Sequence, residues 1–131
     1  MTEATKPRPK FLALNEIRLP IAGFVSILHR VSGAGLFLLL PFLIYLLQLS
    51  LDPSPQSVAR LASLTGNAFV KLILFGLAWA YLHHFCAGIR FLLIDVHVGV
   101  EKVTAQKSAK GVLVVSLLLT ALVGAKLFGG F

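Results

Sequence analysis

Long apolar runs, separated by short polar stretches, dominate the order of residues along the chain. The three runs extend over about residues 21–51, 68–94 and 111–128. A helix that crosses a bilayer needs about 17–25 apolar residues, and each run meets that length. None of the runs has a sustained polar face, which argues against a soluble helical bundle. The pattern predicts an all-α membrane protein with three transmembrane helices in one domain, residues 1–131, in which residues 1–20 form a cytoplasmic segment.

Prolines and charged side chains add detail to these helices. Pro41 lies inside the first run and predicts a bend there, because proline removes a backbone donor. The segment Asp52-Pro53-Ser54-Pro55 predicts the end of that helix and the start of a polar loop. Near the end of the second run, Arg90 is expected to extend its guanidinium outward to the membrane surface.

The charge balance favours a membrane orientation over a nucleic-acid function. The chain is 57% hydrophobic and 13% charged, with a formal net charge of +7, whereas soluble domains carry roughly 25% charged residues. The first loop contains only Arg60 as a positive residue. Residues 1–30 contain five basic residues and the loop between the second and third runs contains three, namely Lys6, Arg8, Lys10, Arg18 and Arg30, and Lys102, Lys107 and Lys110. Positive residues stay on the cytoplasmic side, so the N-terminus is predicted inside and the C-terminus outside.

The first polar cluster lies where the first run begins. Ser26, His29, Arg30 and Gly33 have the spacing i, i+3, i+4, i+7 and share one helix face. One interpretation is an interfacial anchor, in which Arg30 contacts lipid phosphates and Ser32 bonds back to its own helix. The other is a binding site, in which a hydroxyl and a guanidinium hold a quinone carbonyl or a carboxylate. Spacing alone leaves both open.

The second cluster lies inside the second run. His84, Gly88, Phe91 and Asp95 project from one side of the predicted helix, with Asp95 about 16 Å from His84 along the axis. A histidine with a glycine one turn away is typical of a haem ligand beside space for the macrocycle. A hydrogen-bonded packing histidine is the alternative, and His83 competes with His84 as a ligand. The chain offers no convincing second axial ligand, so either another subunit supplies it or no haem is bound.

The chain resembles the cytochrome b membrane-anchor subunit of bacterial succinate dehydrogenase (respiratory complex II) in two motifs, Ser26-Ile-Leu-His29-Arg30-Val-Ser32-Gly33 and His84-x-x-x-Gly88-Ile-Arg90 with Asp95. Its length and its three runs also match, and Arg8-Pro9 with Leu14 to Ile17 resembles that family's amphipathic N-terminal segment. Phe91 stands where the family can have a polar residue, and no role is assigned to it.

The resemblance implies a heterodimeric haem-binding helical bundle, formed with a second small membrane-anchor subunit. It implies haem b, with His84 as one axial ligand, Gly88 packed against the haem, and His29 and Arg30 near the propionates. It implies a ubiquinone site at Ser26, Arg30 and Asp95. A flavoprotein subunit with FAD and an iron–sulfur subunit with its clusters are the implied partners, in a bacterial inner membrane with a periplasmic C-terminus.

The implied function is electron transfer from succinate to ubiquinone, in the tricarboxylic acid cycle and the respiratory chain. The chain alone is expected to be non-catalytic, because it has no flavin fingerprint and no cysteine cluster. Three alternatives remain: an anchor of a quinol:fumarate reductase, a small transporter or channel subunit using Asp95, Arg90 and the histidines, and a structural anchor without haem.

Overall fold

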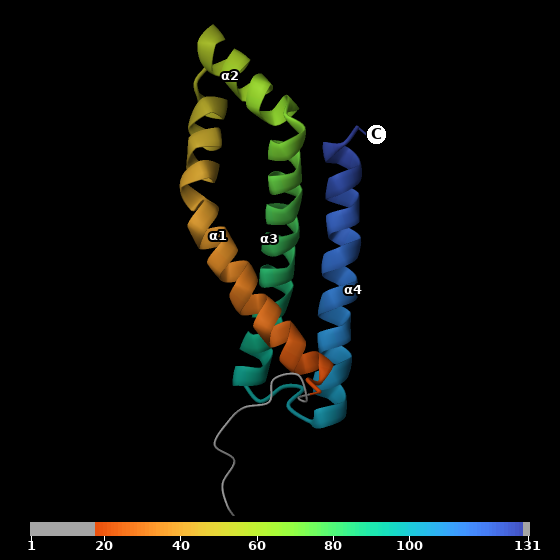
Figure 1. The fold of residues 1–131 in the computed structure, drawn as a ribbon. Coiled ribbons are helices and arrows are strands. Elements are labelled where there is room, and N and C mark those ends of the chain that lie inside the picture. The colour runs from red at the N-terminus through yellow and green to blue at the C-terminus, as the bar shows by residue number, and fades with distance from the viewer. Residues whose placement is uncertain (1–17, 130–131) are drawn as a thin grey trace, which may run out of the picture.

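A computed structural model describes residues 18–129, which form four α-helices and no strand. The helices are α1 (Ile21–Leu51), α2 (Pro55–Gly66), α3 (Ala68–Asp95) and α4 (Lys102–Leu127). Figure 1 shows α3 and α4 side by side, α1 crossing them at one end, and α2 bridging α1 and α3 at the other. Three helices, α1, α3 and α4, are long and apolar enough to cross a membrane. The predicted N-terminal segment, including Lys6, Arg8 and Lys10, lies almost entirely outside the described residues.

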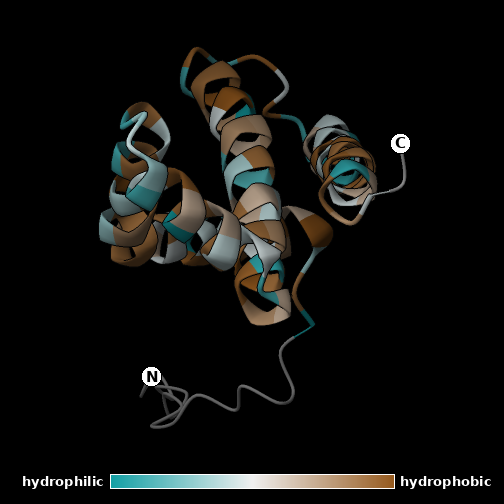
Figure 2. Ribbon diagram, turned by 90° about the horizontal axis from the view of Figure 1, so that it is seen from above, coloured by the Kyte–Doolittle hydropathy of each residue, from teal (hydrophilic) through white to brown (hydrophobic). Residues whose placement is uncertain are grey.

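The burial pattern is the reverse of that in a water-soluble protein. Large apolar side chains point outward, and Phe37 and Leu38 are 75% and 73% exposed. Figure 2 shows that hydrophobic residues make up much of the long helices, on all of their sides. Buried polar side chains are Ser32, His83, Arg90, Ser116 and Thr120. Such an arrangement suits a lipid environment, where apolar surface faces the acyl chains and polar groups must find partners inside.

The first helix and the connection after it follow the sequence expectations only in part. Figure 1 shows that α1 bends about halfway along, and Pro41 lies inside it. The polar loop expected after Asp52 instead contains α2. Ser54 caps this helix by accepting a hydrogen bond from the Ser57 N–H, and Pro55 occupies its first turn. A serine cap followed by proline is a favourable helix start, so local chemistry makes a helix in a polar segment.

The last helix begins nine residues before the predicted apolar run. Lys107 and Lys110 lie on α4 and not in a loop, because α4 starts at Lys102. The turn that connects α3 to α4 contains His97 with φ 65° and Gly99 with φ 75°. Positive φ values are natural for glycine and uncommon for other residues, so they close this connection within a few residues.

Small residues allow α3 and α4 to pack closely. Ala87 and Ala109 are fully buried in a cluster that also contains Val25 from α1. Further along, a Cβ atom at Gly124 would lie 2.5 Å from the ring of Phe75. The helix pair therefore forms a fixed scaffold, against which the start of α1 presents its polar residues.

Candidate functional site

His84 on α3 is oriented by the backbone and a side chain of α1. Its Nδ1 lies 3.0 Å from the carbonyl oxygen of His29 and 3.3 Å from the hydroxyl of Ser32. The Ser32 hydroxyl itself donates to the same carbonyl, at 2.9 Å. A carbonyl only accepts hydrogen bonds, so the His84 proton belongs on Nδ1. Its Nε2 then carries the lone pair that a metal requires.

Gly33 makes this arrangement possible because it has no side chain. A Cβ atom at this position would lie 2.7 Å from Cε1 of His84 and 3.2 Å from Nδ1. These are closer than side chains tolerate, so any larger residue must displace the imidazole. Gly88 has a looser environment, since a Cβ there would lie 3.7 Å from Nε2 of His29. The glycine that the histidine depends on is therefore Gly33, on the opposite helix.

A second imidazole lies directly on the first. The rings of His29 and His84 stack with centroids 4.0 Å apart and planes 14° from parallel. The ring of Phe91 packs against the other histidine, His29, at 5.1 Å. No role was expected for Phe91, and in the structure its ring packs against the histidine pair through His29.

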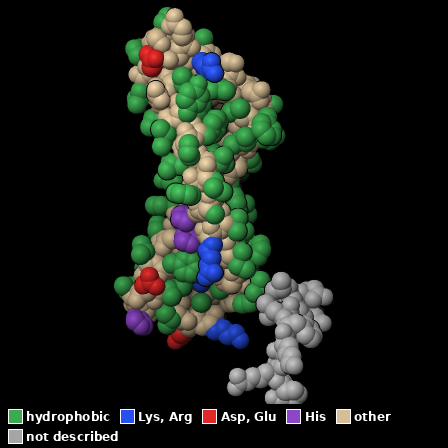
Figure 3. Space-filling model, turned by 60° about the vertical axis from the view of Figure 1, so that its left-hand side comes forward, with side chains coloured by type: hydrophobic (Ala, Val, Ile, Leu, Met, Phe, Trp, Pro, Cys, Tyr) green, Lys and Arg blue, Asp and Glu red, His purple; other side chains and the backbone are tan. Residues whose placement is uncertain are grey.

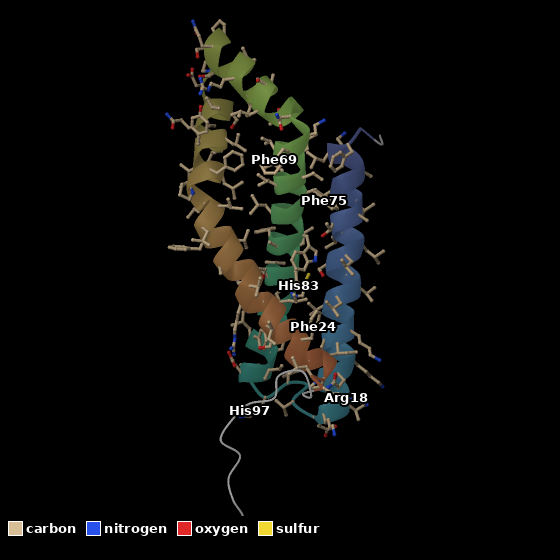
Figure 4. All side chains as sticks on the ribbon, in the orientation of Figure 1. Arg18, Phe24, Phe69, Phe75, His83 and His97 are labelled. Carbon is tan, nitrogen blue, oxygen red and sulfur yellow. The ribbon has the colours of Figure 1, made fainter. Side chains whose placement is uncertain are left out.

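His83 occupies a different environment from its neighbour. It is 0% exposed, and its Nδ1 lies 3.4 Å from the hydroxyl of Ser116 on α4. Its ring stacks on Trp79 at 5.4 Å. Figure 4 places His83 about halfway along α3, within the bundle. A group shared with another subunit cannot reach this imidazole without separating α3 from α4, whereas His84 is partly exposed.

The predicted rim residues are not assembled into one cluster. Arg30 and Asp95 are exposed and Ser26 is partly buried, and within residues 18–129 no hydrogen bond or ion pair joins any two of the three. His29 and Gly33 meet α3, whereas Arg30, one residue further round the helix, points outward. Figure 3 shows histidine and basic side chains near one another on one face, in the half of the molecule where α3 ends. A closed pocket at this face needs surfaces from another chain.

Two residues depart from the sequence analysis. Ser32 bonds back to its own helix as expected, and its hydroxyl also lies 3.3 Å from Nδ1 of His84, a contact that its position alone did not predict. Arg90 does not extend to the membrane surface as expected. It is 7% exposed and donates to the Ser108 hydroxyl and the Ala105 carbonyl of α4. It lies on the stripe of α3 that α4 covers, and so its side chain turns inward.

The positions of Arg90 and the histidines do not favour the transporter or channel alternative. A proton path through Asp95, Arg90 and the histidines requires these groups to connect. Arg90 faces α4 whereas His84 faces α1, and no hydrogen bond links them in the described part of the chain. Residues 18–129 contain no group of three or more histidine, cysteine or acidic side chains that can hold a metal ion. A haem needs only one ligand from each of two chains, and the free Nε2 of His84 fits that demand.

Comparisons with known proteins agree with this arrangement. Residues 4–123 match the family model described as succinate dehydrogenase/fumarate reductase transmembrane subunit. The succinate dehydrogenase cytochrome b556 subunit of Coxiella burnetii is 36% identical over 118 residues, 89% of this chain and 94% of that protein. Subunits of the same name from Rickettsia typhi and Paracoccus denitrificans are each 31% identical, over 92% and 88% of this chain and 93% and 88% of their own. The chain is thus a multi-pass membrane protein that belongs to the succinate dehydrogenase/fumarate reductase transmembrane subunit family, as a membrane anchor of the cytochrome b type.

Proposed function

We propose that this chain anchors a succinate:quinone oxidoreductase in the bacterial inner membrane and contributes one ligand to a haem b shared with a second anchor subunit. The observation that carries the proposal is the orientation of His84. Metal-binding histidines commonly donate their other ring N–H to a backbone carbonyl, which fixes the ring and leaves the second nitrogen free. His84 donates to the carbonyl of His29 in this way.

The residues around His84 fit a haem. Gly33 keeps the imidazole in place, and Gly88 adds no side chain on the same face of α3. His29 and Arg30, at the start of α1, are suited to hold the propionates, because both can donate hydrogen bonds to carboxylates. When bound, the haem supplies a one-electron store beside the quinone site. The ring of Phe91 packs on one side of His29.

The proposed quinone site uses Ser26 and Arg30, with Asp95 as a proton donor. A serine hydroxyl and a guanidinium can donate to a quinone carbonyl and stabilise negative charge as it is reduced. Because these side chains are partly or fully exposed and no hydrogen bond or ion pair joins them, the iron–sulfur subunit and the second anchor complete the pocket. The flavoprotein subunit, which holds FAD, oxidises succinate, and the clusters of the iron–sulfur subunit deliver the electrons.

The distribution of basic residues supports a cytoplasmic location for the end of the bundle where α1 and α4 begin. Arg18, Lys102, Lys107 and Lys110 lie where α1 and α4 begin. Figure 4 shows Arg18 and His97 at this end, and Phe69 toward the other. The opposite end carries Arg60, Lys71 and Lys126. The excess of positive charge at the first end favours an N-terminus inside the cell and a C-terminus in the periplasm.

Substitutions at the rim separate quinone reduction from succinate oxidation. In the purified complex, Ser26→Ala and Arg30→Ala should each lower the rate of quinone reduction and raise the quinone concentration required. Succinate oxidation with an artificial acceptor that takes electrons from the soluble subunits should stay unchanged. Arg60→Ala, which removes an exposed arginine at the other end, serves as the matched control. Quinone kinetics equal to those of Arg60→Ala in both rim variants contradict the proposed site.

A further inference from the structure

A crevice between α3 and α4 lies outside the site described above. Its volume is about 260 Å³, and it is lined mainly by apolar side chains of α3, including Ile89 and Leu93, and by the α3–α4 turn. Three polar side chains contribute to it: Arg90, Thr104 and Ser108. Ile89 and Leu93 lie on a different stripe of α3 from His84 and Gly88, so the crevice opens away from the histidine pair.

The guanidinium of Arg90 is a buried cation without an acidic partner. It is 7% exposed, and its hydrogen bonds go to two neutral acceptors, the Ser108 hydroxyl at 3.0 Å and the Ala105 carbonyl at 3.1 Å. The ring of Phe91, 5.4 Å from its central carbon, is neutral as well. A guanidinium has five N–H donors, so three remain without a partner among the described residues. A buried charge is costly unless a counter-charge meets it.

The location of the crevice narrows the choice of counter-charge. It lies where α3 ends and α4 begins, at the end of the molecule that carries Lys102, Lys107 and Lys110. Ile89 and Leu93 are 46% and 47% exposed, as expected of side chains that face lipid. A ligand there therefore needs an anionic group next to an apolar chain, and it must reach the crevice from the membrane.

We propose that this crevice binds one anionic phospholipid. The phosphate accepts hydrogen bonds from the free N–H groups of Arg90 and from the hydroxyl of Thr104, and an acyl chain lies along Ile89 and Leu93. Basic crevices between transmembrane helices on the cytoplasmic side are suited to anionic headgroups. Zwitterionic lipids fit less well because their own ammonium group offsets the phosphate charge.

The test counts the lipids that the protein retains. The complex is purified with its co-purifying subunits, delipidated in detergent, and given phosphatidylglycerol or phosphatidylcholine, and native mass spectrometry reports the bound lipid. The wild type should prefer phosphatidylglycerol by about fivefold at this site, since one cation near the membrane surface contributes about 1 kcal/mol. Arg90→Gln should retain one phosphatidylglycerol fewer per chain. Arg60→Gln is the control and should retain the wild-type number.

A second variant covers the case in which Arg90→Gln fails to assemble. Ile89→Trp leaves the guanidinium in place and fills the crevice from its lipid-facing side, so it should also lose one retained phosphatidylglycerol. Equal retention of both lipids by the wild type overturns the proposal. So does wild-type retention of phosphatidylglycerol by an assembled Arg90→Gln complex or, where that complex does not assemble, by Ile89→Trp.

Discussion

The fit between Gly33 and His84 gives a quantitative prediction. In Gly33→Ala, the new Cβ atom would lie 2.7 Å from Cε1 of His84, where ordinary contacts begin at 3.4 Å. The imidazole must therefore move by about 0.7 Å. Its Nδ1 lies 3.0 Å from the carbonyl oxygen of His29, and a shift of that size is enough to break this hydrogen bond.

The expected size of the effect follows from overpacking. One extra methyl group in a packed site costs about 1–3 kcal/mol. If this free-energy cost falls on the haem-bound state and not on the haem-free state, the haem dissociation constant rises by about 5- to 150-fold. The assay is the haem content per assembled complex, together with the reduced-minus-oxidised spectrum. Gly33→Ala should contain less haem than the wild type, or haem with a shifted absorption band.

Gly35→Ala provides the matched control. It makes the same chemical change half a turn further along α1, where a Cβ atom would meet nothing within 4 Å. Its haem content and spectrum should equal those of the wild type. If Gly33→Ala is indistinguishable from Gly35→Ala, the interpretation of Gly33 as the residue that positions His84 is wrong.

Two further predictions concern parts of the fold away from the histidines. Gly124→Ala should destabilise the α3–α4 pair by about 1–3 kcal/mol, because its Cβ would lie 2.5 Å from the ring of Phe75. Its thermal unfolding midpoint should lie below that of the control Gly111→Ala, whose Cβ would enter open space. Equal midpoints in the two variants would contradict this prediction. Hydrogen bonds donated by Ser57 and by Ser54, which caps α2, hold the pKa of Asp52 below its usual value of 3.8. Its contribution to the α2 cap is therefore complete above pH 3.8 and is lost as the pH falls through the lowered pKa. Amide exchange in the first turn of α2 should be fast in Asp52→Asn at neutral pH and protected in the wild type down to about pH 4, and equal exchange in the two proteins contradicts this role.

The long helices could be predicted from the apolar runs because lipid exposure makes nearly every position apolar. The shorter features depend on local chemistry that hydropathy does not report. The helix α2 forms from Ser54 and Pro55, a capping signal that was present in the polar segment. The early start of α4 was missed because its first turns carry lysines, although Ala109 in that stretch is fully buried against the rest of the bundle.

Side-chain directions within the site were harder to predict. Neighbouring positions on a helix differ by about 100°, so sequence spacing could not decide which of His83 and His84 faces the outside. That choice depends on where α1 and α4 pack: α4 covers His83, and α1 leaves His84 partly open. The same packing turned Arg90 inward, against the expectation from its position near the helix end.

The most direct test of the proposed function is the identity of the imidazole that binds haem. The ring of His29 lies 4.0 Å from that of His84 and can replace it as a ligand, so the comparison is made in a His29→Ala background. The measurement is the reduced-minus-oxidised spectrum of the purified complex carrying either His84→Ala or His83→Ala in addition. We expect the b-type band to be lost with His84→Ala and retained with His83→Ala. A band that survives the loss of both His29 and His84 contradicts this expectation.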